Sequence, residues 1–301
     1  MTKQEQSNLT ENNYLDTSFE QWALILDKIY GKRNEQRSIS EMWLRAVSDA
    51  SKVGEAVRKS DAYEAMLYLT HTFGWVITSS TKLLKLEFDG KPALLGSDSK
   101  PHNCLTDIVL SKYPSICPYC GGVPCKCSSM RRTVERESKS ERRLRLNKVK
   151  SQAREDGILP ETISGLSNMF EDIYGQVHYG SSLESIAFHF LEEIGEVASC
   201  ITSLEDGKGR HRELVPYNIQ LPEEIADVVG WGFAIMSKLS TLAKDADRLV
   251  QAFNGSQNKP ESLSTSWSST HILPKYLWRE FYSNSEQQYQ CHHCKSNPCE
   301  C

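Results

Sequence analysis

Hydrophobic side chains recur at spacings of three and four along most of the chain, which is the pattern of amphipathic helices. The longest such run predicts a helix that begins near Ser181 or Ser182, either of which can cap it, and its apolar stripe comprises Leu183, Ile186, Ala187, Phe190, Leu191, Ile194, Val197, Ala198 and Ile201. A second helix is expected to open at Leu221-Pro222, with proline in its first turn and acidic residues after it. Further helices are predicted at roughly 18–30, 39–59, 61–86, 161–174 and 240–253. No stretch alternates as a strand does, so we expect an all-α helical bundle.

Several short patterns occur twice, in the same order. Ile29-Tyr30-Gly31 returns as Ile173-Tyr174-Gly175, Gly54-Glu55 as Gly195-Glu196, and Gly74-Trp75 as Gly230-Trp231. Because the matches stay in order, they predict a tandem duplication.

Two carboxylate couplets mark the second copy, and each has the i, i+3 spacing that places both groups on one helix face. They are Glu193-x-x-Glu196 and Glu224-x-x-Asp227. Four carboxylates on adjacent helices repel one another unless cations lie between them. Hard oxygen ligands suit Mg²⁺ or Mn²⁺ together with a phosphate chain. Reading the four acids as ordinary solvated positions fits poorly, since both couplets border apolar faces.

The first copy lacks this set of acids. Aligning Gly54 with Gly195 puts Lys52 opposite Glu193 and keeps Glu55 opposite Glu196. The Gly74 and Gly230 match puts Tyr68 and His71 opposite Glu224 and Asp227. A lysine among ligands opposes a metal ion, so we expect the first copy to be a degenerate partner that binds no metal.

Eight of the ten cysteines form two modules with the common spacing C-x2-C-x4-C-x-C. The modules comprise Cys117, Cys120, Cys125 and Cys127, and then Cys291, Cys294, Cys299 and Cys301. Clustered thiols are typical of metal sites, and four thiolates complete tetrahedral Zn²⁺. We favour one structural zinc in each module. A site that combines both modules, iron–sulfur binding and redox-active disulfides stay open.

The formal net charge of −4 argues against non-specific nucleic-acid binding by the whole protein. The polar N-terminus has no signal-peptide core, and the longest apolar stretch is too short to span a bilayer, so we expect a cytoplasmic protein with no membrane partner. Lys and Arg dominate residues 131–155, but interspersed Glu favours a solvated helix or linker there.

The Glu193–Glu196 and Glu224–Asp227 couplets, within EEIGEVA and PEEIADVVGW, resemble the MazG-like all-α nucleoside triphosphate pyrophosphohydrolases. That superfamily is marked by ExxE followed by ExxD on a second helix. The resemblance covers roughly 165–245 well and 18–90 weakly, and it does not extend to the cysteine modules. It implies that Glu193, Glu196, Glu224 and Asp227 bind divalent ions that bridge a triphosphate. It also implies a site shared by neighbouring copies, so the first copy would complete the second and intrachain pairs would form any homo-oligomer.

The resemblance implies attack of a metal-activated water at the α-phosphorus of a (d)NTP, giving a monophosphate and pyrophosphate. Glu192 is a candidate base that orients this water. Candidate substrate contacts are Lys52, the loop residues Lys208, Arg210 and Arg212, and the aromatic Trp231, with Phe188, His189 and Tyr179 as weaker candidates for base stacking. Two other functions stay open: a non-catalytic nucleotide sensor or scaffold whose cysteine modules bind a partner, and a pyrophosphohydrolase for a phosphoribosyl-nucleotide.

These patterns predict the following domain organisation: a degenerate repeat at 1–95, a first four-cysteine module at 96–130, a charged linker helix at 131–160, a catalytic repeat at 161–253, and a loop with the second four-cysteine module at 254–301.

Overall fold

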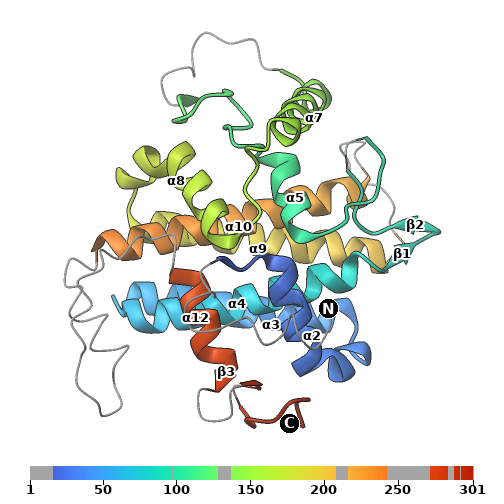
Figure 1. Ribbon diagram of the computed structural model, residues 1–301, viewed down its shortest axis with the longest axis vertical. Coiled ribbons are helices and arrows are strands. Elements are labelled where there is room, and N and C mark those ends of the chain that lie inside the picture. Colours follow the sequence, from blue (N-terminus) through green and yellow to red (C-terminus); the bar gives the residue numbers. More distant parts are fainter. Residues whose placement is uncertain are drawn as a thin grey trace.

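The computed structural model describes residues 16–96, 98–127, 137–207, 216–242, 272–283, 288–291 and 293–300, and this part of the chain is mostly helical. Its helices are α2 (Phe19–Glu35), α3 (Ile39–Arg58), α4 (Ala62–Leu83), α5 (Leu105–Lys112), α7 (Lys139–Glu155), α8 (Ile163–Tyr179), α9 (Leu183–Glu205), α10 (Tyr217–Leu242) and α12 (Ile272–Phe281). Two-residue strands form two small antiparallel hairpins, β1 (Glu87–Phe88) with β2 (Lys91–Pro92) and β3 (Tyr282–Ser283) with β4 (Gln288–Tyr289). The prediction of a helical fold is therefore confirmed (Figure 1).

Hydroxyl side chains cap five of the described helices, including α7 through Ser138, because each accepts a hydrogen bond from a backbone N–H that the first turn leaves without a partner. Ser18 and Thr162 cap α2 and α8, while Ser38 and Ser182 cap α3 and α9. These four helices match the predicted ones closely at their N-terminal ends. The first and second halves of the chain therefore begin their helices with the same chemistry.

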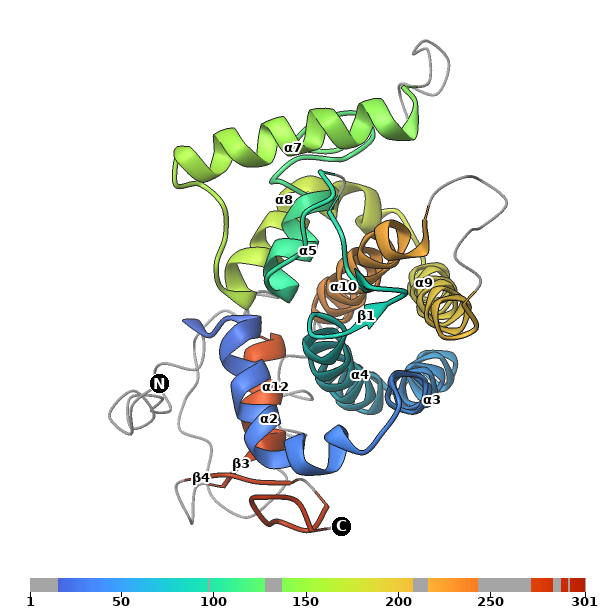
Figure 2. The same cartoon turned by 90° about the vertical axis from the view of Figure 1, so that its right-hand side faces the viewer.

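The long helices α3, α4, α9 and α10 lie side by side and are seen nearly end-on in Figure 2. The indole N–H of Trp43 on α3 donates to the carbonyl oxygen of Ile194 on α9 at 3.0 Å. Phe73 on α4 packs beside Gly232 on α10, where an added Cβ would lie 2.6 Å from the ring. One hydrophobic core therefore joins the two halves of the chain.

Each cysteine module packs against the half of the chain to which it is not directly attached. The module that follows α5, residues 117–127 (module A), docks on α8, where the Cys125 N–H donates to the Ile173 carbonyl at 2.7 Å. The module that follows α12, residues 291–300 (module B), docks on α2, where the Cys299 N–H donates to the Ile29 carbonyl at 2.7 Å. The helix that precedes each module follows the same rule, since α5 packs on α10 and α12 packs on α4. The two halves thus exchange their C-terminal segments.

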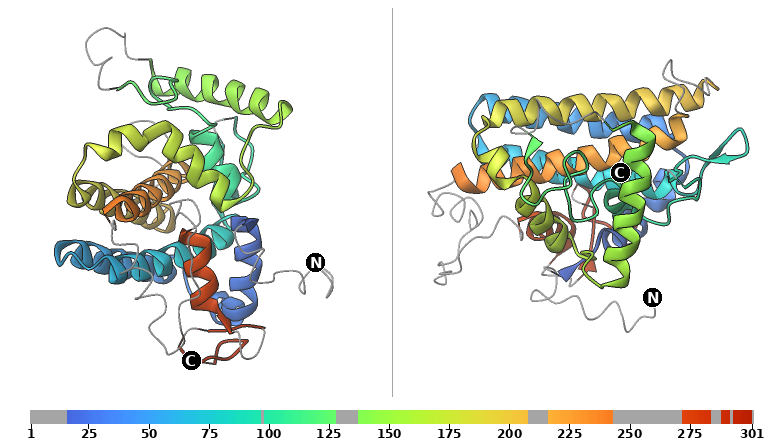
Figure 3. Two further views of the ribbon diagram at one scale, coloured as in Figure 1. Left: turned by 60° about the vertical axis from the view of Figure 1, so that its left-hand side comes forward. Right: turned by 90° about the horizontal axis from the view of Figure 1, so that it is seen from above.

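Helix α7 lies across α5 on the outside of the molecule, as Figures 2 and 3 show. The ammonium of Lys150 donates to the Asp107 carboxylate at 2.5 Å and to the Ser111 hydroxyl at 2.6 Å, both on α5. His102 lies 2.8 Å from the same carboxylate. Burial opposes ionisation of Asp107, but His102 and Lys150 outweigh it and hold the pKa of that carboxyl well below its usual range. The described part of the charged segment is therefore the helix α7, and these ion pairs fix it to the protein.

Helix α10 begins at Tyr217, one turn before the predicted start at Leu221, so Pro222 lies inside the helix. Proline has no N–H to donate to the carbonyl four residues before it. That carbonyl, of Asn218, instead accepts the Leu95 N–H at 2.8 Å. The helix tolerates proline because another segment supplies the missing donor. Of the helix predicted at 240–253, the structure describes only the part that continues α10 to Leu242.

Candidate functional site

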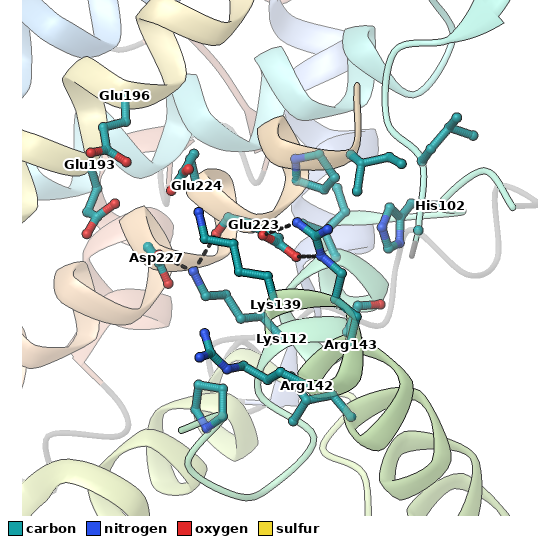
Figure 4. Close-up of a pocket in the computed structure, with 18 of the residues that line it drawn as sticks. His102, Lys112, Lys139, Arg142, Arg143, Glu193, Glu196, Glu223, Glu224 and Asp227 are labelled. Carbon is teal, nitrogen blue, oxygen red and sulfur yellow. Dashed lines mark hydrogen bonds and ion pairs between the residues drawn. The ribbon is translucent and has the colours of Figure 1, made fainter. Parts of the chain in front are cut away.

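Three of the four predicted metal-binding carboxylates converge between α9 and α10. Oxygen atoms of Glu193, Glu224 and Asp227 all lie within 4.8 Å of one another. Glu224 and Asp227 are buried and Glu193 is partly buried. Glu196 lines the same cavity but is solvent-exposed and lies outside this group of three (Figure 4). The i, i+3 spacing therefore predicted the shared face correctly.

The cavity beside these acids, which we call the carboxylate cavity, has a volume of about 270 Å³. Its opposite wall is cationic and is formed by Lys112 of α5 with Lys139, Arg142 and Arg143 of α7. In Figure 4 the Lys112 and Lys139 head groups point toward the acids. Lys112 pairs directly with this negative cluster, and the other cations line the remaining space, which is wide enough for a small ligand. Sequence reasoning missed these four cations, because nothing in the local sequence distinguishes a cation at a cavity from a solvated one.

Asp227 is held by two side chains from the end of α5. Lys112 forms an ion pair with one carboxylate oxygen, and the Tyr113 hydroxyl donates to the other. Burial disfavours charge on Lys112, but the nearby Asp227 outweighs it and raises the pKa of the ammonium. Burial and Asp227 also raise the pKa of Tyr113 well above its ordinary value. Lys112 therefore stays charged and Tyr113 stays neutral as a donor.

Glu193 and Glu224 have less compensation for their charge. Burial, followed by the charge of Asp227, raises the pKa of Glu193 to about 8. Burial raises the pKa of Glu224 to about 7, although Lys112 and a 2.9 Å hydrogen bond from the Gln220 amide favour its ionised form. Carboxylates whose ionisation is costly gain most from a cation placed between them. The donor chemistry and the spacing of these oxygens fit a hard divalent ion such as Mg²⁺.

Helix α7 also connects the carboxylate cavity to module A. Arg143 holds Glu223 in a bidentate ion pair, at 2.6 and 2.9 Å. The Arg142 guanidinium lies over the Tyr119 ring, 4.7 Å from its centroid, and Tyr119 belongs to module A and lines the cavity. Arg142 Nε is buried and has no hydrogen-bond acceptor among the described residues, its nearest carboxylate being Glu137 at 3.9 Å. Arg142 thus brings an unused donor to the cavity wall.

Some predicted substrate contacts lie elsewhere. Glu192 is exposed on α9 and lies 3.2 Å from His189, outside the residues that line the carboxylate cavity. Trp231 stacks on His189 with ring centroids 4.7 Å apart and does not line the cavity either. Phe188 and Tyr179 are exposed, with 73% and 77% of their surfaces accessible. The loop residues Lys208, Arg210 and Arg212 lie outside the described residues.

Lys52 lines a second cavity, of about 630 Å³, in the first half of the chain. Because cations dominate the charged side chains around it, we call it the basic cavity, and its wall includes Arg33, Arg37, Arg45, Lys52, Tyr68 and Trp75. Lys52 therefore does not line the carboxylate cavity.

Aligning α3 with α9 on their helix caps instead of their glycines shifts the pairing by one turn. Counted from Ser38 and Ser182, Asp49 takes the position of Glu193 and Lys52 that of Glu196. Glu55, which the glycine match paired with Glu196, lies on the exposed face and pairs with Lys59 at 2.6 Å. The two glycines also differ in their surroundings, since a Cβ on Gly54 would lie 3.1 Å from Leu191, whereas Gly195 has nothing within 4 Å. Asp49 and Lys52 do line the basic cavity.

The cysteines gather as the spacing predicted. The four sulfur atoms of module A lie within 4.8 Å of one another, as do those of Cys291, Cys294 and Cys299 in module B, while Cys301 lies outside the described residues. Sulfur separations are 3.6 Å for Cys117–Cys127, 4.0 Å for Cys120–Cys125 and 3.9 Å for Cys294–Cys299. A tetrahedral zinc with bonds of about 2.3 Å places sulfurs about 3.8 Å apart, far beyond a disulfide of about 2.05 Å. Both modules thus have the spacing of metal sites.

The two modules share their backbone turn. The N–H of Gly121 donates to the Cys117 carbonyl, and that of Lys295 donates to the Cys291 carbonyl, each at 2.9 Å. Both residues have positive φ, 69° and 60°, which a glycine adopts more easily than a lysine. In module A, burial opposes the Cys120 thiolate, but the backbone N–H groups of Lys126 and Gly122 outweigh it and lower its pKa to about 7. A thiol with a lowered pKa forms the thiolate more easily, and the thiolate is the form that binds metal.

The remaining cysteines are not part of these clusters. Cys104 caps α5 by accepting the Asp107 N–H, and Cys200 is buried on α9. Burial raises the pKa of both thiols to about 12, so both stay protonated near neutral pH.

Comparison with known proteins gave no match to any family model, curated protein or solved structure. Assignment of a function therefore rests on the residues and geometry of the chain itself. Among the described residues, no helix is both long and apolar enough to cross a membrane.

Proposed function

We propose that this protein is an Mg²⁺-dependent nucleoside triphosphate pyrophosphohydrolase, which converts a (d)NTP to the monophosphate and pyrophosphate. One observation carries the proposal: Glu193, Glu224 and Asp227 converge within 4.8 Å beside a wall of Lys and Arg side chains. A carboxylate cluster alone suits a metal ion, and a cationic wall alone suits an anion. Their combination suits a metal-bound phosphate chain.

The bound ion would be held by Glu193, Glu224 and Asp227, and it would supply Lewis-acid polarisation of a phosphoryl oxygen. Arg142, with its buried Nε lacking an acceptor among the described residues, and Lys139 would grip the non-bridging oxygens of the phosphate chain. Lys112 would hold the Asp227 carboxylate in place. Tyr119 offers an aromatic face at the cavity wall for the nucleoside.

We assign the attacking water to Glu196 rather than to Glu192. Glu196 is exposed and lines the cavity, whereas Glu192 contacts His189 and does not line it. In the proposed reaction Glu196 accepts a proton as the water oxygen bonds to the α-phosphorus. The bond from that phosphorus to its bridging oxygen breaks, and pyrophosphate leaves with the bonding electrons.

We further propose that each cysteine module binds a structural zinc ion and that the chain is a duplicated MazG-like bundle forming its own pseudo-dimer. Support for the duplication comes from equivalent caps on α2, α8, α3 and α9, and from the two modules that dock through matching bonds at Ile29 and Ile173. The first half then supports the catalytic half and itself keeps an acid at one of the four positions, Asp49.

The test is a pyrophosphate-release assay across common and modified (d)NTPs with Mg²⁺, with a phosphoribosyl-nucleotide in the same panel. Wild type is compared with Glu224→Gln and Asp227→Asn, and Glu192→Gln serves as the matched control because this acid of α9 does not line the carboxylate cavity. Monophosphate and pyrophosphate from wild type and Glu192→Gln, but not from the other two folded variants, would support the proposal. Absence of turnover with any compound, while nucleotide still binds, would contradict catalysis and favour a sensor.

A further inference from the structure

We propose that the basic cavity in the first half binds a phosphate chain, such as that of a nucleotide, without a divalent cation. Its wall contributes Arg33, Arg37, Arg45 and Lys52, whereas Asp49 is its one carboxylate among the described residues. A volume of about 630 Å³ falls in the usual range for small-molecule sites. The charge and size of the cavity both favour an organic anion.

The basic cavity occupies the place that the carboxylate cavity occupies in the second half. Counted from the helix caps, Lys52 takes the position of Glu196. Counted from Gly74 and Gly230, Tyr68 and His71 take the positions of Glu224 and Asp227. All three replacements remove a negative charge. A divalent ion would gain little attraction here, whereas a phosphate group would gain from the lysine and the arginines.

Two guanidinium groups at the cavity have room for an anion. Arg37 and Arg45 each lie 5.7 Å from the centre of the Trp75 ring. Neither forms an ion pair within the part of the chain that the structure describes. Burial and the charges of Arg33 and Arg45 lower the pKa of Arg37, which shows that the cations crowd one another. A phosphate between them would relieve this repulsion and accept bidentate hydrogen bonds.

Neighbouring groups contact Arg37 and Lys52, and the Lys52 side chain stays 45% exposed. Lys82 donates to the Asn34 carbonyl at 2.9 Å and thereby fixes the connection between α2 and α3, which carries Arg37. The Asn34 side-chain oxygen also accepts a 3.0 Å hydrogen bond from Arg37. Lys52 lies 4.9 Å above the Tyr68 ring and 3.0 Å from Asp49. A site held in this way loses little side-chain entropy on binding.

Module B closes one side of the basic cavity, as module A does for the carboxylate cavity. Cys291 and His293 line the basic cavity, and Arg33 donates to the Cys299 sulfur at 3.7 Å. The module of each exchanged segment thus borders one ligand cavity. Metal binding in module B would help to shape the site that we propose.

Calorimetric titration without added divalent cation tests the proposal, with pyrophosphate and ATP as separate probes. Wild type and Asp227→Asn are compared with Arg37→Gln and Arg45→Gln. Arg58→Gln, an exposed change on α3 outside the cavity, is the matched control. We expect wild type, Asp227→Asn and Arg58→Gln to bind alike, and each cavity variant to bind at least tenfold more weakly. Circular dichroism verifies that every variant is folded, and Lys52→Gln replaces any cavity variant that is not.

Equal affinity for the two probes would mean that the phosphate chain alone is recognised, and tighter binding of ATP would mean that the nucleoside contributes; both support the proposal. Binding that requires Mg²⁺ or disappears in Asp227→Asn would assign the ligand to the carboxylate cavity and overturn it. Absence of binding, or equal affinity in Arg37→Gln, Arg45→Gln and Arg58→Gln, would overturn it as well.

Discussion

The ammonium of Lys112 and the carboxylate of Asp227 form an ion pair that joins α5 to α10. Its counterpart in the first half joins α12 to α4, where Glu280 lies 3.4 Å from His71. The exchanged helix supplies the basic side chain in one half and the acidic side chain in the other. Each exchanged helix therefore meets a side chain of the opposite acid–base type on the helix against which it packs.

We expect Lys112→Met to destabilise the protein when no divalent ion is present. The change removes the ammonium while the buried Asp227 remains, and loss of one partner of a buried pair costs about 3 kcal/mol. Mg²⁺ should recover part of this loss because it supplies the missing positive charge. Urea unfolding with and without Mg²⁺ measures both effects. Lys148→Met, at an exposed position of α7, is the control, and equal stability of the two variants would refute the role given to Lys112.

The stability of the metal-free protein should fall as the pH rises through the neutral range. Burial raises the pKa of Glu193 to about 8 and that of Glu224 to about 7, from 4.5. Between 4.5 and the raised value, the folded state holds a proton that the unfolded state has lost, so each group contributes stability at low pH that is lost as pH rises.

Glu193→Gln should remove part of this slope. Between pH 5 and pH 7 the difference from wild type is about one proton, or about 1.4 kcal/mol per pH unit. Denaturant unfolding at several pH values, without divalent ions, gives the two slopes. Parallel slopes would show that Glu193 has an ordinary pKa. In the presence of Mg²⁺ the wild-type slope should flatten, since the ion binds the ionised carboxylates.

Arg142→Gln should lower kcat/KM for the triphosphate about 10- to 100-fold, the usual cost of losing a charged hydrogen bond to phosphate. The reason is the buried Nε of Arg142 at the cavity wall, which has no acceptor among the described residues. Steady-state kinetics against Lys148→Gln, also on α7, separates this contact from a general change in charge. Equal kcat/KM for the two variants would exclude Arg142 from substrate binding.

Loss of either cysteine module should lower the bound zinc, but only module A should affect catalysis. Cys117→Ser removes a ligand from the module that carries Tyr119 into the carboxylate cavity, whereas Cys291→Ser acts at the basic cavity. Metal analysis should show one equivalent fewer in each variant. Cys200→Ser, at a buried cysteine outside both modules, should retain all the metal. A full metal content in Cys117→Ser would contradict the site in module A.

The sequence predicted the elements whose evidence is periodic. The apolar stripe of α9 and the spacing of its carboxylates are both local patterns, so the helix and the shared face of Glu193 and Glu196 could be inferred. The cysteine clusters were likewise evident from spacing alone. The all-α interpretation held for the same reason.

The features that could not be predicted from the sequence depend on contacts between distant segments. Lys112 and Arg142 lie on α5 and α7, where nothing local distinguishes a cavity cation from a solvated one. The start of α10 depends on Leu95, which supplies the donor that Pro222 lacks. Asp49 could have been matched to Glu193 from sequence, had the cap serines rather than the glycines been aligned. The basic cavity has no sequence motif and emerges from the packing of α2, α3 and α4.

The exchange of α5 with module A and of α12 with module B has a consequence for the chain as an assembly. Cut at residues 128–136, the chain would give two fragments, each carrying the docking segment that the other requires and lacking its own. Neither fragment alone should fold fully, while the mixture should reconstitute both cavities. Ordinary tandem repeats can fold as separate units. Each half of this chain instead packs on a segment that the other half supplies, so the two halves depend on each other to fold.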